Sequence, residues 1–174
     1  MRPNPFQWSF RQQYLLVFAA CAGMIGFALF SQSHWELNPC PLCIFQRIAY
    51  AALGVVCLIG GLHAPKGGLG RKLYGLLALI AGGTGIGIAG RHVWLTTLPE
   101  DKVPACGPPL EFMMEQNPFA DAVKMVLTGS GECAKVDWHM LGVSMPAWSL
   151  IGFVGLTLFA LYAAFKRRTP LASQ

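Results

Sequence analysis

Residues 44–62 read IFQRIAYAALGVVCLIGGL, an apolar run interrupted by a single charged side chain, Arg47. A helix needs about 20 such residues to cross the roughly 30 Å of hydrocarbon in a bilayer. Three further runs of similar length and character occupy residues 14–30, 73–90 and 147–165. The pattern predicts an all-α integral membrane protein, folded as an antiparallel four-helix transmembrane bundle.

The composition of the whole chain agrees with this prediction. Of its 174 residues, 54% are hydrophobic and only 12% are charged, whereas about a quarter of the residues in an average soluble domain are charged. This excludes a disordered protein and a protein that coats nucleic acid. We therefore treat residues 1–174 as a single membrane domain in contact with the lipid bilayer, with the first run retained as a span rather than cleaved as a signal.

The charged side chains are sorted to opposite sides of the four predicted spans. Residues 1–13, 63–72 and 166–174 contain basic residues and no acid, while all 8 acidic residues fall within residues 31–43 and 91–146. Because basic segments stay on the cytoplasmic side, both termini are expected in the cytoplasm of a bacterial cell and the other two segments in the periplasm. The net charge of +5 then reflects orientation and does not indicate a nucleic-acid partner.

The long outer segment, residues 91–146, is not uniformly polar. Apolar side chains recur around acids between residues 112 and 127, a pattern typical of a short interfacial helix on the membrane surface. A helix that caps the end of the bundle fits the same pattern equally well. Residues 129–131 read Gly-Ser-Gly, which predicts a turn that lets the following Cys133 move.

The 6 cysteines fall into two classes by position. Cys21 and Cys57 lie within predicted spans, where a thiol usually behaves as a small hydrophobic side chain. The other four lie on the side that we assign to the periplasm, an oxidising compartment where disulfides persist. They are Cys40, Cys43, Cys106 and Cys133.

The segment Cys40-Pro41-Leu42-Cys43 runs directly into the second span. Proline is favoured at the first position of a helix, so Cys43 belongs to the first turn, where unpaired N–H groups and the helix dipole stabilise a thiolate. Arg47 follows four residues later on the same helix face and is positioned to hold a thiolate or an oxygen atom of a bound electron acceptor. The alternative for Arg47 is a side chain that only reaches for the lipid headgroups.

The second pair, Cys106 and Cys133, has three interpretations. A disulfide between them would staple the long outer segment, or both thiols could exchange with a partner protein, because glycines and prolines place them in exposed segments. A metal centre built from all four outer cysteines is disfavoured by the wide separation of this pair, so we predict no metal. Four cysteines also permit three pairings.

Taken together, these features resemble the DsbB family of disulfide bond formation proteins of bacterial inner membranes. The resemblance rests on the four spans, Cys40-Pro41-Leu42-Cys43 with Arg47, the outer pair Cys106 and Cys133, and residues 144–149, which read SMPAWS at the start of the last span. It covers nearly the whole chain, and its motifs are specific in combination.

The resemblance implies a monomeric thiol:quinone oxidoreductase. A reduced periplasmic oxidase of the DsbA type would attack a Cys106–Cys133 disulfide at Cys106, and Cys133 would then exchange with Cys40 and release Cys43. The electrons would pass to ubiquinone or menaquinone, near Arg47. His92, at the outer end of the third span, is a further candidate for quinone contact, and the first and fourth spans are expected to complete the pocket. An interfacial histidine is the alternative for His92.

Two other functions remain open from the sequence. A vitamin K epoxide reductase-like enzyme also carries a Cys-x-x-Cys motif in a helical bundle, although its motif lies toward a later span. A membrane scaffold with purely structural disulfides is the non-enzymatic alternative. We expect no bound flavin, because the stretch GIGIAG at residues 85–90, which could suggest a dinucleotide site, lies inside a span and is better explained by helix packing.

Overall fold

The computed structural model describes residues 5–34, 40–98, 139–140 and 142–166. These form a 3-10 helix, Pro5–Gln7, followed by four long helices and one pair of short strands. The long helices are α1 (Phe10–His34), α2 (Pro41–His63), α3 (Gly68–Thr96) and α6 (Met145–Phe165). The strands are β1 (His139–Met140) and β2 (Val143–Ser144).

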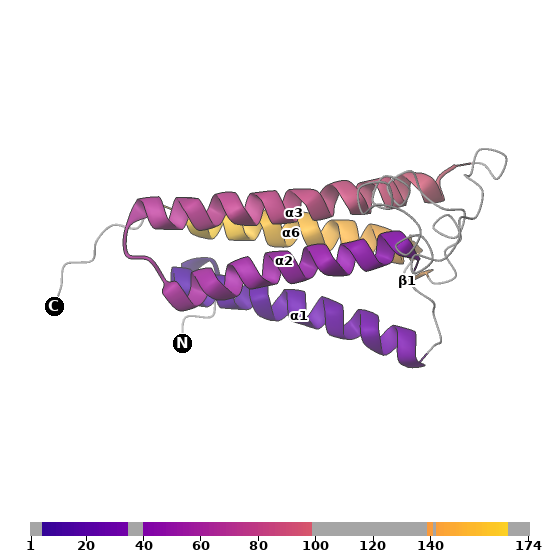
Figure 1. Ribbon diagram of the computed structural model, residues 1–174, viewed down its shortest axis with the longest axis horizontal. Helices are drawn as coiled ribbons and strands as arrows, with labels where there is room; N and C mark the ends of the chain where they lie inside the picture. Colours follow the sequence, from indigo (N-terminus) through magenta and orange to yellow (C-terminus); the bar gives the residue numbers. More distant parts are fainter. Residues whose placement is uncertain (1–4, 35–39, 99–138, 141, 167–174) are drawn as a thin grey trace, which may run out of the picture.

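The four long helices alternate in direction along the chain and lie side by side (Figure 1). α1 packs on α2 and α6, α3 packs on the same two helices, and α2 and α6 also touch each other over a smaller contact. We call the end at which α2 begins the cysteine end, and the opposite end, where α1 begins and α6 stops, the terminal end. Toward the cysteine end α1 diverges from the other helices (Figure 1).

All four helices are long and apolar enough to cross a membrane. Their outward faces carry large hydrophobic side chains that a soluble protein would bury. Examples from the four helices are Leu29, Ile48, Ile80 and Leu158, each at least half exposed. The structure therefore confirms the prediction of an all-α, four-helix membrane bundle.

The helices extend beyond the apolar runs from which they were predicted. The predicted run 73–90 lies within the helix Gly68–Thr96, and the run 14–30 within Phe10–His34. The reason is that hydrocarbon thickness limits the apolar run, whereas a helix continues into the headgroup region as long as its hydrogen-bond ladder does. Consequently residues 91–96, which we assigned to the outer segment, continue α3 as its last turns.

The tightest seam of the bundle lies between α3 and α6, where glycines of α3 face larger side chains of α6. A Cβ atom added at Gly85 would overlap the ring of Phe153, and one at Gly75 would come within 2.7 Å of the Cβ of Ala164. Small residues allow such close approach of membrane helices. Gly85 is therefore required by the close packing, whereas a Cβ added at Gly83 of the same helix would meet no atom within 4 Å.

The seam is continuous with an aromatic stack that reaches α2. The ring of Tyr50 stacks on that of Phe153, with centroids 3.8 Å apart and an angle of 14° between the rings. The hydroxyl of Tyr50 donates a hydrogen bond to the carbonyl oxygen of Ser149 at 2.9 Å. Both rings are buried, so the ring of Phe153 cannot move away from α3.

A small hairpin precedes α6. Strands β1 and β2 pair antiparallel, with His139 opposite Ser144 and Met140 opposite Val143, and Gly142 in the turn has a φ of 76°. The sequence patterns did not predict this hairpin, because two-residue strands carry no periodic signal. The predicted interfacial helix at residues 112–127 lies outside the described residues.

We expect Gly85→Ala to lower the free energy of unfolding by about 1–3 kcal/mol, because the new methyl group overpacks against a ring that is held in place. Gly83→Ala is the matched control on the same helix and is expected to leave stability nearly unchanged. Unfolding of both variants in mixed detergent micelles, followed by circular dichroism, measures the difference. Equal stabilities would contradict the close approach of α3 and α6.

Candidate active site

The Cys-x-x-Cys segment forms the N-terminus of α2. Cys40 is the N-cap residue, with φ −66° and ψ 161°, and Pro41 opens the helix, as predicted. The Sγ atom of Cys40 accepts a hydrogen bond from the backbone N–H of Cys43 at 3.4 Å. We predicted helix-terminal stabilisation for the sulfur of Cys43, but this bond is made to Cys40, because an N-cap side chain lies over the free N–H groups of the first turn.

The two sulfur atoms of this segment lie 3.0 Å apart, and both side chains are half buried. Between them Leu42 is fully buried and packs with Ile88 and Leu95 of α3. The apolar contact of Leu42 therefore anchors the turn on α3, while the sulfurs on either side remain partly accessible.

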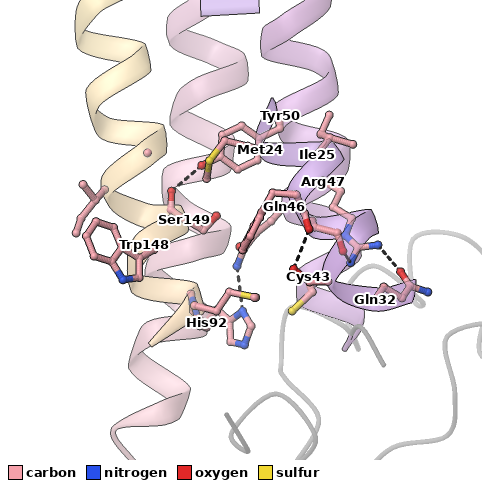
Figure 2. Close-up of a pocket in the computed structure, with 17 residues that line it drawn as sticks. Met24, Ile25, Gln32, Cys43, Gln46, Arg47, Tyr50, His92, Trp148 and Ser149 are labelled. Atoms are coloured by element: carbon pink, nitrogen blue, oxygen red, sulfur yellow. Dashed lines mark hydrogen bonds between the residues drawn. The ribbon is translucent and has the colours of Figure 1, made fainter. Parts of the chain in front are cut away.

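His92 is buried and lies beside the Cys-x-x-Cys segment. Its Nε2 atom is 3.8 Å from Sγ of Cys40, and its Nδ1 atom is 3.0 Å from Nε2 of Gln46 on α2. Figure 2 shows Gln46 and His92 facing each other between the two helices. The structure thus brings His92 beside Cys40 and Cys43, although Cys40 and His92 are 52 positions apart in the sequence.

Arg47 is held by α1 rather than extended into solvent. Its Nη1 donates a hydrogen bond to Oε1 of Gln32 at 2.7 Å, and its Nη2 donates to the carbonyl oxygen of Ala28 at 3.1 Å. The guanidinium group points toward Gln32 in Figure 2. These bonds fix one positive charge near the diverging end of α1, so Arg47 is a positioned cation and not merely a side chain that reaches for headgroups.

A cavity of about 570 Å³ lies at this end of the bundle, walled by all four long helices. Cys43, Gln46, Arg47 and His92 contribute polar groups from α2 and α3, and Gln32 contributes one from α1 (Figure 2). The rest of the wall is mostly apolar and comes from α1 and α6, as expected for the first and fourth spans. These apolar residues include Met24, Ile25, Phe27, Met145, Pro146, Trp148 and Ile151. Such a site suits a flat, largely apolar ligand with a few polar atoms.

The remaining cysteines are placed as follows. Cys21 and Cys57 are buried in the core of the bundle, which agrees with their interpretation as small hydrophobic side chains. Cys106 and Cys133 lie outside the described residues, so their pairing stays a prediction.

Sequence reasoning missed two glutamines of the site, Gln32 and Gln46. Both are polar side chains at or inside an apolar run, and such residues are functional candidates by default. That rule would have selected them, but it could not have paired Gln32 with Arg47 or Gln46 with His92, because both contacts depend on how the helices pack.

The site also offers three donors to a soft metal ion. The ligand atoms of Cys40, Cys43 and His92 lie within 4.8 Å of one another, and thiolates with imidazole are ligands that zinc accepts. However, the amide nitrogen of Gln46 faces Nδ1 of His92. A metal-bound histidine instead directs the N–H of its second nitrogen to an acceptor such as a carbonyl or a carboxylate. The arrangement favours thiol chemistry over metal binding.

The chain matches the family model described as disulfide bond formation protein DsbB over residues 10–163. It is 56% identical over 168 residues to disulfide bond formation protein B of Xanthomonas campestris pv. campestris (strain 8004), covering 96% of this chain and 97% of the relative. It is 57% identical over 166 residues to the protein of the same name from Xanthomonas axonopodis pv. citri (strain 306), covering 95% and 96% of the two chains. It is 49% identical over 173 residues to the protein of the same name from Xylella fastidiosa (strain 9a5c), covering 98% of this chain and 99% of the relative.

We expect the reduced protein in detergent to react with iodoacetamide at Cys40 and Cys43 about ten times faster, or more, than at Cys21 and Cys57, because only accessible thiols that can ionise are nucleophiles. Mass spectrometry of peptides from a time course gives the four rates. Rapid labelling of Cys21 or Cys57 in the folded protein would contradict their burial in the core.

Proposed function

The chain belongs to the DsbB family of disulfide bond formation proteins, and from this premise we propose that it oxidises the dithiol of a periplasmic DsbA-type oxidase and passes the electrons to a membrane quinone. Disulfide oxidoreductase activity follows from the family; the partner and the acceptor are the parts that we add. Family membership also removes the vitamin K epoxide reductase-like alternative.

One observation carries the choice of acceptor: a redox-capable cysteine pair borders a mostly apolar cavity. Cys43 is part of the cavity wall, and Arg47 supplies a positioned guanidinium group beside it. The apolar walls of α1 and α6 suit the ring and the first isoprenoid units of ubiquinone or menaquinone, and the guanidinium of Arg47 suits a quinone carbonyl oxygen. The residues therefore fit this substrate.

The proposed electron path begins at the outer cysteine pair. A thiolate of the reduced oxidase attacks Cys106, breaking the Cys106–Cys133 disulfide and forming a mixed disulfide. The freed Cys133 thiolate attacks Cys40, and Cys43 leaves as a thiolate. The second thiol of the oxidase then displaces Cys106, so the oxidase departs with its disulfide formed.

The second half of the cycle restores both disulfides of the enzyme. The Cys106 thiolate attacks Cys133 and releases Cys40, which leaves Cys40 and Cys43 as a dithiol. Reforming their disulfide gives two electrons and two protons to the quinone, which becomes a quinol. Electron flow from DsbA to the quinone needs a strong acceptor, because DsbA is itself a strong oxidant with a reduction potential of about −120 mV. No metal or flavin takes part in the proposal.

We propose further that the protein lies in the bacterial inner membrane as a monomer, with the cysteine end in the periplasm. Support comes from the charges at the terminal end, where Arg11, Lys66, Arg71 and Lys166 lie on or next to the helix ends. Basic residues of this kind remain on the cytoplasmic side.

We expect the purified protein to reduce quinone when a reduced DsbA-type oxidase is supplied as the electron donor. Cys43→Ser and Cys106→Ser are each expected to abolish turnover, because each breaks the proposed path at a different disulfide. Cys21→Ala serves as the control, since this thiol is buried in the core and takes no part in the path. Quinone absorbance measures the rate.

Two outcomes of this assay would count against the proposal. Turnover that survives Cys43→Ser would remove the path through the Cys40–Cys43 pair. A protein that oxidises no donor with either ubiquinone or menaquinone would favour the scaffold alternative.

We expect Arg47→Lys to raise the KM for quinone about tenfold, with a smaller effect on kcat, because lysine keeps the charge but loses the planar fork that spans Gln32 and Ala28. Arg91→Lys is the control: Arg91 lies on α3, where its guanidinium covers the ring of Trp94 at 4.2 Å. Steady-state kinetics with a short-chain quinone measures both constants. An unchanged KM in Arg47→Lys would show that the guanidinium does not contact the quinone.

A further inference from the structure

Gln46 and His92 form a buried polar pair between α2 and α3. Their exposed fractions are 6% and 2%, and the atoms that meet are Nε2 of Gln46 and Nδ1 of His92, 3.0 Å apart. A polar pair at this depth in a membrane bundle is costly unless its hydrogen bond is made. Their contact therefore constrains which hydrogen atoms the two side chains carry.

The contact selects one tautomer of the imidazole ring. In the orientation that the structure gives the Gln46 carboxamide, its nitrogen faces Nδ1 of His92. This nitrogen has two N–H donors and no acceptor, so in this arrangement Nδ1 accepts and carries no proton. The ring proton then sits on Nε2. That atom is 3.8 Å from Sγ of Cys40, a distance at which an N–H still interacts with the large sulfur atom.

We propose that Gln46 is a positioning residue for the redox site: it holds His92 neutral with its proton on Nε2, and this N–H stabilises the thiolate of Cys40. The inference deepens the function proposed above. When Cys40 ionises, its proton leaves to solvent, while His92 keeps its own proton and donates a hydrogen bond. The donors to the Cys40 sulfur then include Nε2–H of His92 and the backbone N–H of Cys43.

Within the part of the chain that the structure describes, the other charged side chains near this end are engaged elsewhere. The other titratable or charged side chains described near this end are Cys43, Arg47 and Tyr50 on α2, Arg91 on α3, and His34 on α1. The guanidinium of Arg47 is bonded to α1, that of Arg91 covers Trp94, and His34 stacks on Phe30. Tyr50 is bonded to α6, and neither α1 nor α6 adds a titratable group to the cavity wall.

This arrangement divides the work between the two cysteines. The wall of the cavity includes Cys43, whereas Cys40 faces His92 and is absent from that wall. When the pair closes, the sulfurs of Cys40 and Cys43 become bonded and two electrons pass to the quinone of the proposed function, which takes up two protons and becomes a quinol. A thiolate at Cys40 has already released its proton for this step. His92 then donates a hydrogen bond to the sulfur of Cys40, in contrast with the quinone contact that we expected from the sequence.

The first test measures the tautomer directly. In the reduced protein with ¹⁵N-labelled histidine, we expect the nitrogen resonances of His92 to show a bare Nδ1 and a protonated Nε2. Gln46→Glu is expected to move a proton onto Nδ1, because a carboxylate can only accept. A proton on Nδ1 in the parent protein would overturn the proposal, and this result needs no variant to fold.

The second test measures the Cys40 thiolate. In the Cys43→Ala background, we expect Gln46→Met to slow alkylation of Cys40 at pH 7 by about threefold to tenfold, the effect of losing one net hydrogen bond. The pH at which alkylation is half-maximal should rise accordingly. Gln32→Met, the same substitution at a glutamine that contacts Arg47 instead, should leave this midpoint unchanged.

A third readout separates this proposal from the general function. With Cys43 intact, Gln46→Met should lower kcat for quinone reduction and leave the KM for quinone nearly unchanged. A raised KM with an unchanged Cys40 midpoint would overturn the proposal and return His92 to the role of quinone contact. Because the nitrogen resonances and the alkylation rates require no turnover, they test Gln46 even if the acceptor proves not to be a quinone.

Discussion

Hydrocarbon offers no hydrogen-bond partner, and this constraint organises the whole molecule. Each backbone N–H and C=O within the bilayer must be satisfied inside its own helix, so the chain crosses as four long helices. Polar side chains face the same demand and can be kept only where another polar group meets them. The site at the cysteine end is the place where several such groups meet.

The bundle meets this demand by combining one tight seam with one open end. Glycines let α3 approach α6 so closely that Phe153 is pressed on Tyr50, whose hydroxyl is bonded to the backbone of α6. Toward the cysteine end α1 diverges (Figure 1), and the space is walled by apolar residues of α1 and α6. Rigid packing on one side thus coexists with a ligand-sized cavity on the other.

Two polar pairs define the chemistry of that cavity, and each joins a different helix to α2. The bond between Arg47 and Gln32 ties α1 to α2 and fixes a positive charge, while the bond between Gln46 and His92 ties α3 to α2 and orients an imidazole. Since Gln46 and Arg47 are neighbours in sequence, adjacent positions of one helix serve opposite sides of the site. The Cys-x-x-Cys turn lies at the helix terminus between them, capped by its own sulfur.

The sequence by itself determined the features that depend on local rules. Apolar length specified four membrane helices, and proline after Cys40 specified that α2 begins at the Cys-x-x-Cys segment, because hydrocarbon thickness and the missing N–H of proline act within a single stretch of chain. Only the tertiary structure decided which glycines lie in the α3–α6 seam. It also decided that Cys40 faces His92 and that Gln32 accepts a hydrogen bond from Arg47. These contacts join residues on different helices, and their partners are selected by the rotation and tilt of each helix in the bundle, which no local pattern records.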